Sequence, residues 1–91
     1  MSEHDITYFK TEKWLNPKTS PSTGSVVCYD GQTEFSDGIG RNAFLQISDC
    51  HNIVRLHKCY ADSVGDFIAK LRCLRDEING FIKHLEDEPR E

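Results

Sequence analysis

The sequence predicts an α+β fold in which a three- or four-stranded antiparallel sheet is followed by one long C-terminal amphipathic helix, packed on one face of the sheet. Two observations lead to this prediction. The last third of the chain repeats apolar residues at helical spacing, and the segment before it alternates apolar and polar residues around a turn. A chain of 91 residues can bury a real core, so we expect one domain spanning residues 1–91.

The N-terminal third predicts one strand and one loop. Residues 1–5 are polar, and we expect them to be loose. Residues 6–13 alternate weakly and include two aromatic residues and two threonines, which favours a strand. Residues 16–24 hold two prolines within a run of turn-forming residues, so they predict an exposed loop.

The next stretch predicts short strands separated by glycine turns. Residues 25–30 are typical of a strand, and Asp30-Gly31 predicts a turn that ends it. We expect a further short strand over residues 33–35. Residues 36–42 contain two glycines and predict a flexible loop.

A β-hairpin is predicted over residues 43–59. A turn at 49–52 pairs Ile47 with Val54 and Leu45 with Leu56, which places these four aliphatic residues on one face. The other face then carries a mixed set of side chains: Phe44, Gln46, Ser48, Ile53, Arg55 and His57. The agreement between turn position and facing supports this register.

Residues 63–88 predict the helix. Ser63 is an N-cap candidate, and Asp66 stands three residues later, as in a capping box. The apolar residues recur with gaps of three and four, which is the period of one helix face. They are Val64, Phe67, Ile68, Leu71, Leu74, Ile78, Phe81, Ile82 and Leu85.

Composition narrows the function classes. The chain has 15 acidic and 11 basic residues and a net charge of −4, which argues against a general binder of nucleic acid or membranes. The start of the chain lacks the features of a signal peptide, and no apolar run is long enough to span a bilayer. We therefore expect a cytoplasmic protein with four reduced cysteines.

No motif predicts catalysis or a cofactor. The cysteines and histidines lack the tight pairs of a zinc site, and His57 and Cys59 are too far apart along a strand for a nucleophile and its base. Residues 38–41 hold two glycines and an arginine but no phosphate-binding motif. We expect no enzyme activity, no metal and no cofactor.

Acidic residues form two groups that we predict to contact a partner protein. An acidic surface on a small domain can occupy a basic nucleic-acid channel on another protein. The predicted partner-binding residues are Asp30, Glu34 and Asp37 in one group, and Glu86, Asp87 and Glu88 in the other.

The far half of the helix predicts a homodimer. A helix of about 22 residues spans about 33 Å, whereas a six-residue strand spans about 20 Å, so a small sheet leaves the far end of the stripe uncovered. We expect Gly80 to lie near the contact between copies. The alternative is that the first strand and the residues after it cover that end within one chain, through Ile6, Tyr8, Phe9, Trp14 and Leu15. The predicted dimer interface is Leu74, Ile78, Phe81, Ile82 and Leu85.

The function expected from these features is that of a small acidic, non-enzymatic protein-binding module. It would inhibit or regulate a partner protein, for example a nucleic-acid-binding one, by occupying its surface, and would act as a homodimer. In size, charge and lack of motifs it is similar to the small inhibitors that phages and mobile elements encode. Two alternatives stay open: a binder of a small ligand or nucleotide at a subunit interface, and a minor nucleic-acid-binding accessory factor.

Overall fold

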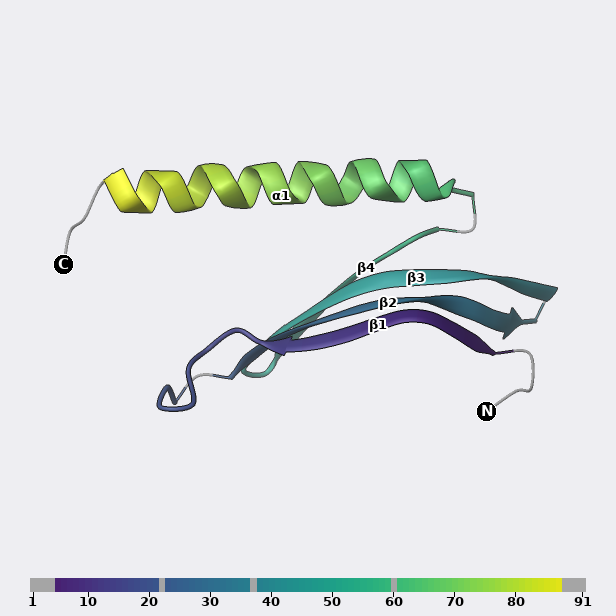
Figure 1. The fold of residues 1–91 in the computed structure, drawn as a ribbon, viewed down its shortest axis with the longest axis horizontal. Helices are drawn as coiled ribbons and strands as arrows, with labels where there is room; N and C mark the ends of the chain where they lie inside the picture. The colour runs from purple at the N-terminus through teal and green to yellow at the C-terminus, as the bar shows by residue number, and fades with distance from the viewer. Residues whose placement is uncertain (1–4, 22, 37, 60, 88–91) are drawn as a thin grey trace. The chain divides into compact units, whose positions relative to one another are not determined.

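A computed structural model describes residues 5–21, 23–36, 38–59 and 61–87 of the chain. It shows a four-stranded antiparallel sheet followed by one C-terminal helix (Figure 1), which confirms the predicted α+β fold class. The chain divides after residue 60 into a sheet unit and a helix unit. The packing of the helix on the sheet and the single domain therefore stay predictions.

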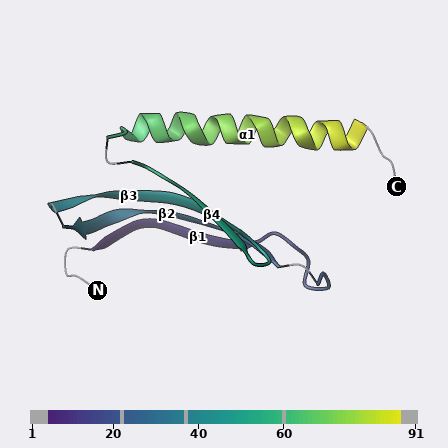
Figure 2. The same ribbon diagram turned by 180° about the vertical axis from the view of Figure 1, so that it is seen from behind.

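The sheet is a simple meander. Its strands are β1 (Ile6–Trp14), β2 (Gly24–Phe35), β3 (Gly38–Asp49) and β4 (Asn52–His57), and their order across the sheet is β1-β2-β3-β4. Each strand lies beside its neighbours in sequence, as Figures 1 and 2 show from opposite sides. The edges of the sheet are therefore formed by β1 and β4.

The β3–β4 hairpin has the predicted register. Ile47 pairs with Val54 and Leu45 with Leu56, and the strands close at the pair of Asp49 with Asn52. Cys50, in the turn, has a φ of 54°. This left-handed conformation costs a residue with a Cβ roughly 1–2 kcal/mol, and the ladder that follows the turn offsets that cost.

The β2–β3 hairpin corrects three predictions. The turn predicted at Asp30-Gly31 is wrong, because β2 continues to Phe35 and Gly31 pairs with Asn42. Residues 33–35 belong to β2, and residues 38–42 begin β3 instead of forming a loop. Gly31 suits this strand for a packing reason: an added Cβ would collide with the hydroxyl of Tyr29 and the carbonyl oxygen of Ile6.

β1 is one residue longer than the stretch of β2 that it faces. The pairing runs from Ile6 with Gln32 to Trp14 with Ser25, and its register shifts between Thr7 and Phe9. Tyr8 is the extra residue, as in a β-bulge, which redirects a side chain and increases the local twist.

The connection between β1 and β2 is tied to the β3–β4 turn. The N–H of Leu15 donates to the carbonyl of Gly24 at 2.8 Å, and the N–H of Cys50 donates to the carbonyl of Thr23 at 2.7 Å. Both views show this loop at the same end of the sheet as the β3–β4 turn (Figures 1 and 2). Gly24, the last residue of the predicted loop, already belongs to β2.

The helix α1 (Val64–Asp87) starts at the predicted capping box. The N–H of Asp66 donates to Oγ of Ser63 at 3.0 Å, and the N–H of Ser63 donates to Oδ2 of Asp66 at 3.0 Å. The backbone N–H of Ser63, which donates to the carboxylate, is the main cause that lowers the pKa of Asp66. The last residue of the predicted helix, Glu88, lies outside the described residues.

Strand pairing sorts the side chains of β2, β3 and β4 into two faces. The aliphatic face contains Val26, Cys28, Leu45, Ile47, Val54 and Leu56. The mixed face contains Val27, Tyr29, Phe44, Gln46, Ile53, Arg55 and His57. No apolar side chain among the described residues of the sheet unit is buried. Neither face is therefore a core by itself.

Candidate functional site

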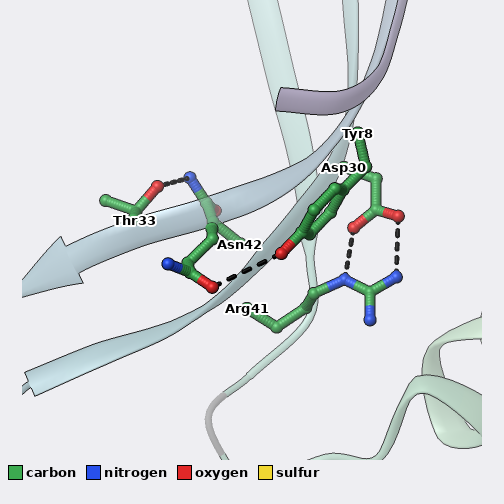
Figure 3. A network of polar contacts seen from close by, with 6 residues as sticks. Tyr8, Asp30, Thr33, Arg41 and Asn42 are labelled. Atoms are coloured by element: carbon green, nitrogen blue, oxygen red, sulfur yellow. Dashed lines mark hydrogen bonds and ion pairs between the residues drawn. The ribbon is translucent and has the colours of Figure 1, made fainter. Parts of the chain in front are cut away.

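Asp30, one of the predicted partner-binding residues, is engaged in an ion pair. Its carboxylate accepts two hydrogen bonds from Arg41, at 2.5 Å from Nε and 2.7 Å from Nη2 (Figure 3). Tyr8 flanks the pair: its ring centre is 5.5 Å from Cζ of Arg41, and its hydroxyl donates to Oε1 of Gln32 at 3.3 Å. The hydrogen bonds from Arg41 lower the pKa of Asp30. Arg41 thus offsets the charge that Asp30 would present to a basic partner.

Glu34, another acidic residue of the first predicted group, lies near the end of β2. Its backbone N–H donates to Oδ1 of Asp5 at 3.2 Å. This contact adds the carboxylate of Asp5, which sequence reasoning did not include. Asp37 lies outside the described residues.

The second acidic group lies at the end of α1. Glu86 is exposed, and Asp87 forms an ion pair with Lys83, with Nζ and Oδ2 at 3.3 Å. Glu88 lies outside the described residues. Because this group belongs to the helix unit and Asp30 belongs to the sheet unit, a common acidic surface stays a prediction.

The predicted dimer interface follows one stripe of α1. Among its members Phe81 is 63% exposed and Leu85 is 56% exposed. Gly80 does not lie on this stripe: at 3.6 residues per turn it is displaced from the stripe centre by about 150°. A Cβ added to Gly80 would meet nothing within 4 Å. The expectation that Gly80 lies near the contact between copies stays a prediction, and its position off the stripe centre does not favour it.

The mixed face carries an aromatic cluster capped by a cation. The rings of Tyr29 and Phe44 stack with centroids 5.2 Å apart, and Cζ of Arg55 lies 4.1 Å from the Phe44 centroid. Gln46 orients Arg55, because its Oε1 accepts hydrogen bonds from Nε at 3.1 Å and Nη2 at 2.7 Å. The predicted hairpin register already paired Gln46 with Arg55; the stacking needed the β2–β3 register, which the sequence did not predict.

A cleft of about 840 Å³ lies in the sheet unit, where β3 extends beyond β4. We call it the β3 cleft. Small residues leave space there: Gly38 and Gly40 line it, and a Cβ on Gly40 would come within 3.3 Å of the Phe35 ring. Its described lining is Phe35, Ser36, Gly38, Ile39, Gly40, Arg41, Asn42, Phe44, Arg55, His57, Lys58 and Cys59. Its size falls in the range of ligand sites, about 300–1,000 Å³.

The described cysteines and histidines can be checked for metal-binding and nucleophilic arrangements. In the described part of the chain, no three His, Cys, Asp or Glu side chains gather closely enough to hold a metal ion. None of the four cysteines is in a disulfide. His57 and Cys59 both line the β3 cleft, but no hydrogen bond joins them.

No family model, curated protein or solved structure matches this chain. No described segment forms a helix that combines the length and the apolar character needed to cross a membrane.

Proposed function

We propose that this chain is a non-enzymatic protein-binding module that inhibits or regulates a partner protein by occupying its surface, and that it acts as a homodimer. The observation that supports the proposal is an excess of uncovered apolar surface. The sheet unit has apolar side chains on both faces, none of them buried among its described residues, and α1 adds a third apolar surface.

One helix cannot cover both faces of the sheet. If α1 packs on the aliphatic face as predicted, the two cover each other over the length of the strands. Val27, Phe44 and Ile53 on the mixed face then still need a cover. Exposed apolar patches of this kind mark interaction surfaces, and burying them contributes about 25 cal/mol per Å² before association costs.

A second copy is the proposed cover for the far end of α1. A twofold axis lets one stripe cover its own copy, which is the commonest arrangement of homo-oligomers. The 24-residue helix spans about 36 Å. β2 and β3 have 12 residues each and span about 40 Å, so only β4, with six residues, is as short as the sequence led us to expect. The support for the dimer is therefore the exposure of the stripe, where Phe81 is 63% and Leu85 is 56% exposed.

The partner contact would combine apolar surface with the acidic residues. Glu34, Glu86 and Asp87, with Asp37 and Glu88, are the proposed contributors toward a basic surface of a partner, for example a nucleic-acid-binding protein. Asp30 contributes less, because it already binds Arg41. The proposed location is the cytoplasm, where unpaired cysteines are normally stable.

Light scattering at tens of micromolar tests the dimer. We expect the mass of two chains for the parent protein and of one chain for Phe81→Glu, because a carboxylate would be desolvated at the contact. Asn79→Glu is the matched control: it adds the same charge to α1 but lies about 110° from the stripe centre, so its dimer should persist. A single-chain mass for the parent, or equal loss of the dimer in both variants, contradicts the proposal.

A further inference from the structure

Part of β3 has no neighbouring strand on one side. β3 pairs with β2 from Gly38 to Asp49, whereas its pairing with β4 covers only Phe44 to Asp49. The ladder is extended by one bond, from the N–H of Lys58 to the carbonyl of Ala43 at 2.9 Å. Beyond that bond, no described strand pairs with the outer edge of residues 38–42.

The bond to Ala43 shows which backbone groups face this open edge. In an antiparallel ladder, residues two apart direct their N–H and C=O groups to the same side. Because the carbonyl of Ala43 points toward β4, the N–H and C=O groups of Arg41 and Ile39 point outward as well. Such a row of polar groups is a template for an added strand.

The β3 cleft borders the open edge and carries positive charge. Arg55 and Lys58 line it as cations, whereas the charge of Arg41, which also lines it, is offset by Asp30. The described lining contains no carboxylate, although the whole chain has a net charge of −4. Arg55 is held in place by Gln46 and the Phe44 ring, and Nη1 of Arg55 makes no hydrogen bond to a described residue. A fixed guanidinium with unused donors suits a carboxylate.

We propose that the open edge of β3 and the β3 cleft bind an extended, acidic peptide segment of a partner protein, which adds to the sheet as a fifth strand. Backbone hydrogen bonds to Ile39 and Arg41 would hold the segment, and its acidic side chains would reach Arg55 and Lys58. Five residues of β3, 38–42, provide an edge of about 17 Å. The inference rests on the proposed function only in that the ligand is a protein.

Charge favours a partner segment over a second copy at this edge. A second copy paired through residues 38–42 would bring no carboxylate to Arg55 and Lys58 from that segment, because those five residues contain none. A small anion could use the cations of the cleft, but it would leave the backbone groups of the edge unused.

The first test is amide hydrogen exchange of the free, full-length protein by NMR. The amides of Ile39 and Arg41 should exchange much faster than those of Leu45 and Ile47, which face β4. Comparable protection of all four would mean that the edge is already occupied, by the chain itself or by a second copy, and would overturn the proposal. The dimer is measured separately by light scattering, so either result can fail alone.

The second test uses defined peptides. The probe is a pool of acetylated and amidated pentapeptides with Glu at positions 2 and 4 and Val, Ile, Leu, Phe or Tyr at the other positions. At about millimolar concentration we expect it to shift the amides of residues 38–42 and 55–59 and to slow exchange at Ile39 and Arg41. The same pool with Gln in place of Glu should bind about tenfold more weakly.

N-methylation distinguishes strand addition from simple anion binding. One peptide pool is methylated at positions 1, 3 and 5 and the other at positions 2 and 4. Each pool therefore lacks either the N–H groups that face β3 or those that face away, so one pool should lose binding and the other should keep it. Equal effects, no shifts with any pool, or the same shifts with benzoate or inorganic phosphate would overturn the proposal.

Two variants locate the site on the protein. Arg55→Gln should weaken binding of the Glu pool about tenfold, whereas Lys13→Gln, which removes the same charge from β1, should leave it unchanged. Gly40→Val should abolish binding by filling the cleft against Phe35. Circular dichroism of Gly40→Val checks its fold, and the methylated pools decide the outcome if it is unfolded. Equal affinities of Arg55→Gln and Lys13→Gln would overturn the site.

Discussion

The sheet and the helix of this protein differ in how much apolar surface they expose. The helix has one apolar stripe, a polar remainder and a capping box that satisfies its first turn. The sheet has apolar side chains on two faces, and its described residues include no buried apolar side chain. One stripe can cover one face.

The difference indicates which apolar surfaces of the molecule need to be covered. The aliphatic face matches a helix stripe in character. The mixed face is stabilised by its own cross-strand contacts, since Tyr29, Phe44, Gln46 and Arg55 pack on one another. We therefore expect the stability of the protein to depend strongly on the aliphatic face and weakly on the mixed face.

The largest effect expected is that of Ile47→Ala on the aliphatic face. If that face is covered in solution, the substitution should lower the free energy of unfolding by about 2–5 kcal/mol, through lost burial and the cavity left behind. Ile53→Ala is the matched control, because Ile53 lies on the mixed face of the same hairpin and is 68% exposed. It should cost less than about 1 kcal/mol.

Urea unfolding of the two variants measures this contrast. Equal costs near zero would mean that the aliphatic face is uncovered. Equal costs of several kcal/mol would mean that both faces are covered, which would break the contrast between them.

Local pattern was sufficient to predict α1 and the β3–β4 hairpin. The helix prediction rested on a stripe of nine residues and a capping box, and the hairpin prediction on the agreement of turn position with side-chain facing. Both signals lie within segments of about 25 residues or fewer. The β2–β3 hairpin was not predicted, because Gly31, Gly38 and Gly40 resemble turn residues when taken alone. The strand role of Gly40 depends on the ring of Phe35, and that of Gly31 depends on the hydroxyl of Tyr29 and the carbonyl of Ile6.

The ion pair of Asp30 and the β3 cleft both depend on the β2–β3 register, which was not predicted. Asp30 was predicted to contact a partner because its ion pair with Arg41 was not foreseen. That pair forms only when β2 and β3 are aligned through residue 35. The β3 cleft likewise requires residues 38–42 to be a strand longer than its neighbour. The sequence contains the cations and glycines, but only the pairing brings them together.

A smaller effect is expected from Gly80→Ala in α1. Glycine inside a helix costs about 1 kcal/mol relative to alanine, and an added Cβ at this position meets no described atom within 4 Å. The substitution should therefore raise the free energy of unfolding by about 0.5–1 kcal/mol, measured in urea. It should leave the mass in light scattering unchanged, since Gly80 lies away from the stripe. Destabilisation would show that something covers the back of the helix.

The smallest effect expected concerns the ion pair of Asp30 and Arg41. The side chains are 28% and 43% exposed, so solvent screening limits the contribution of the pair to about 0.2–1 kcal/mol. Because Arg41 lowers the pKa of Asp30 below its ordinary value of 3.8, the pair stabilises the fold above that pH. This stabilisation is lost as the pH falls through the lowered pKa.

Asp30→Asn isolates the contribution of this pair. The difference in free energy of unfolding between parent and variant should be largest at neutral pH and should shrink below pH 3.8, the ordinary value for Asp30. Asp66, whose pKa is also lowered, titrates in both proteins and cancels in the difference. Urea unfolding from neutral to acidic pH measures it. A difference that persists unchanged at acidic pH would show that Asp30 acts through packing and not through its charge, because protonation removes only the charge.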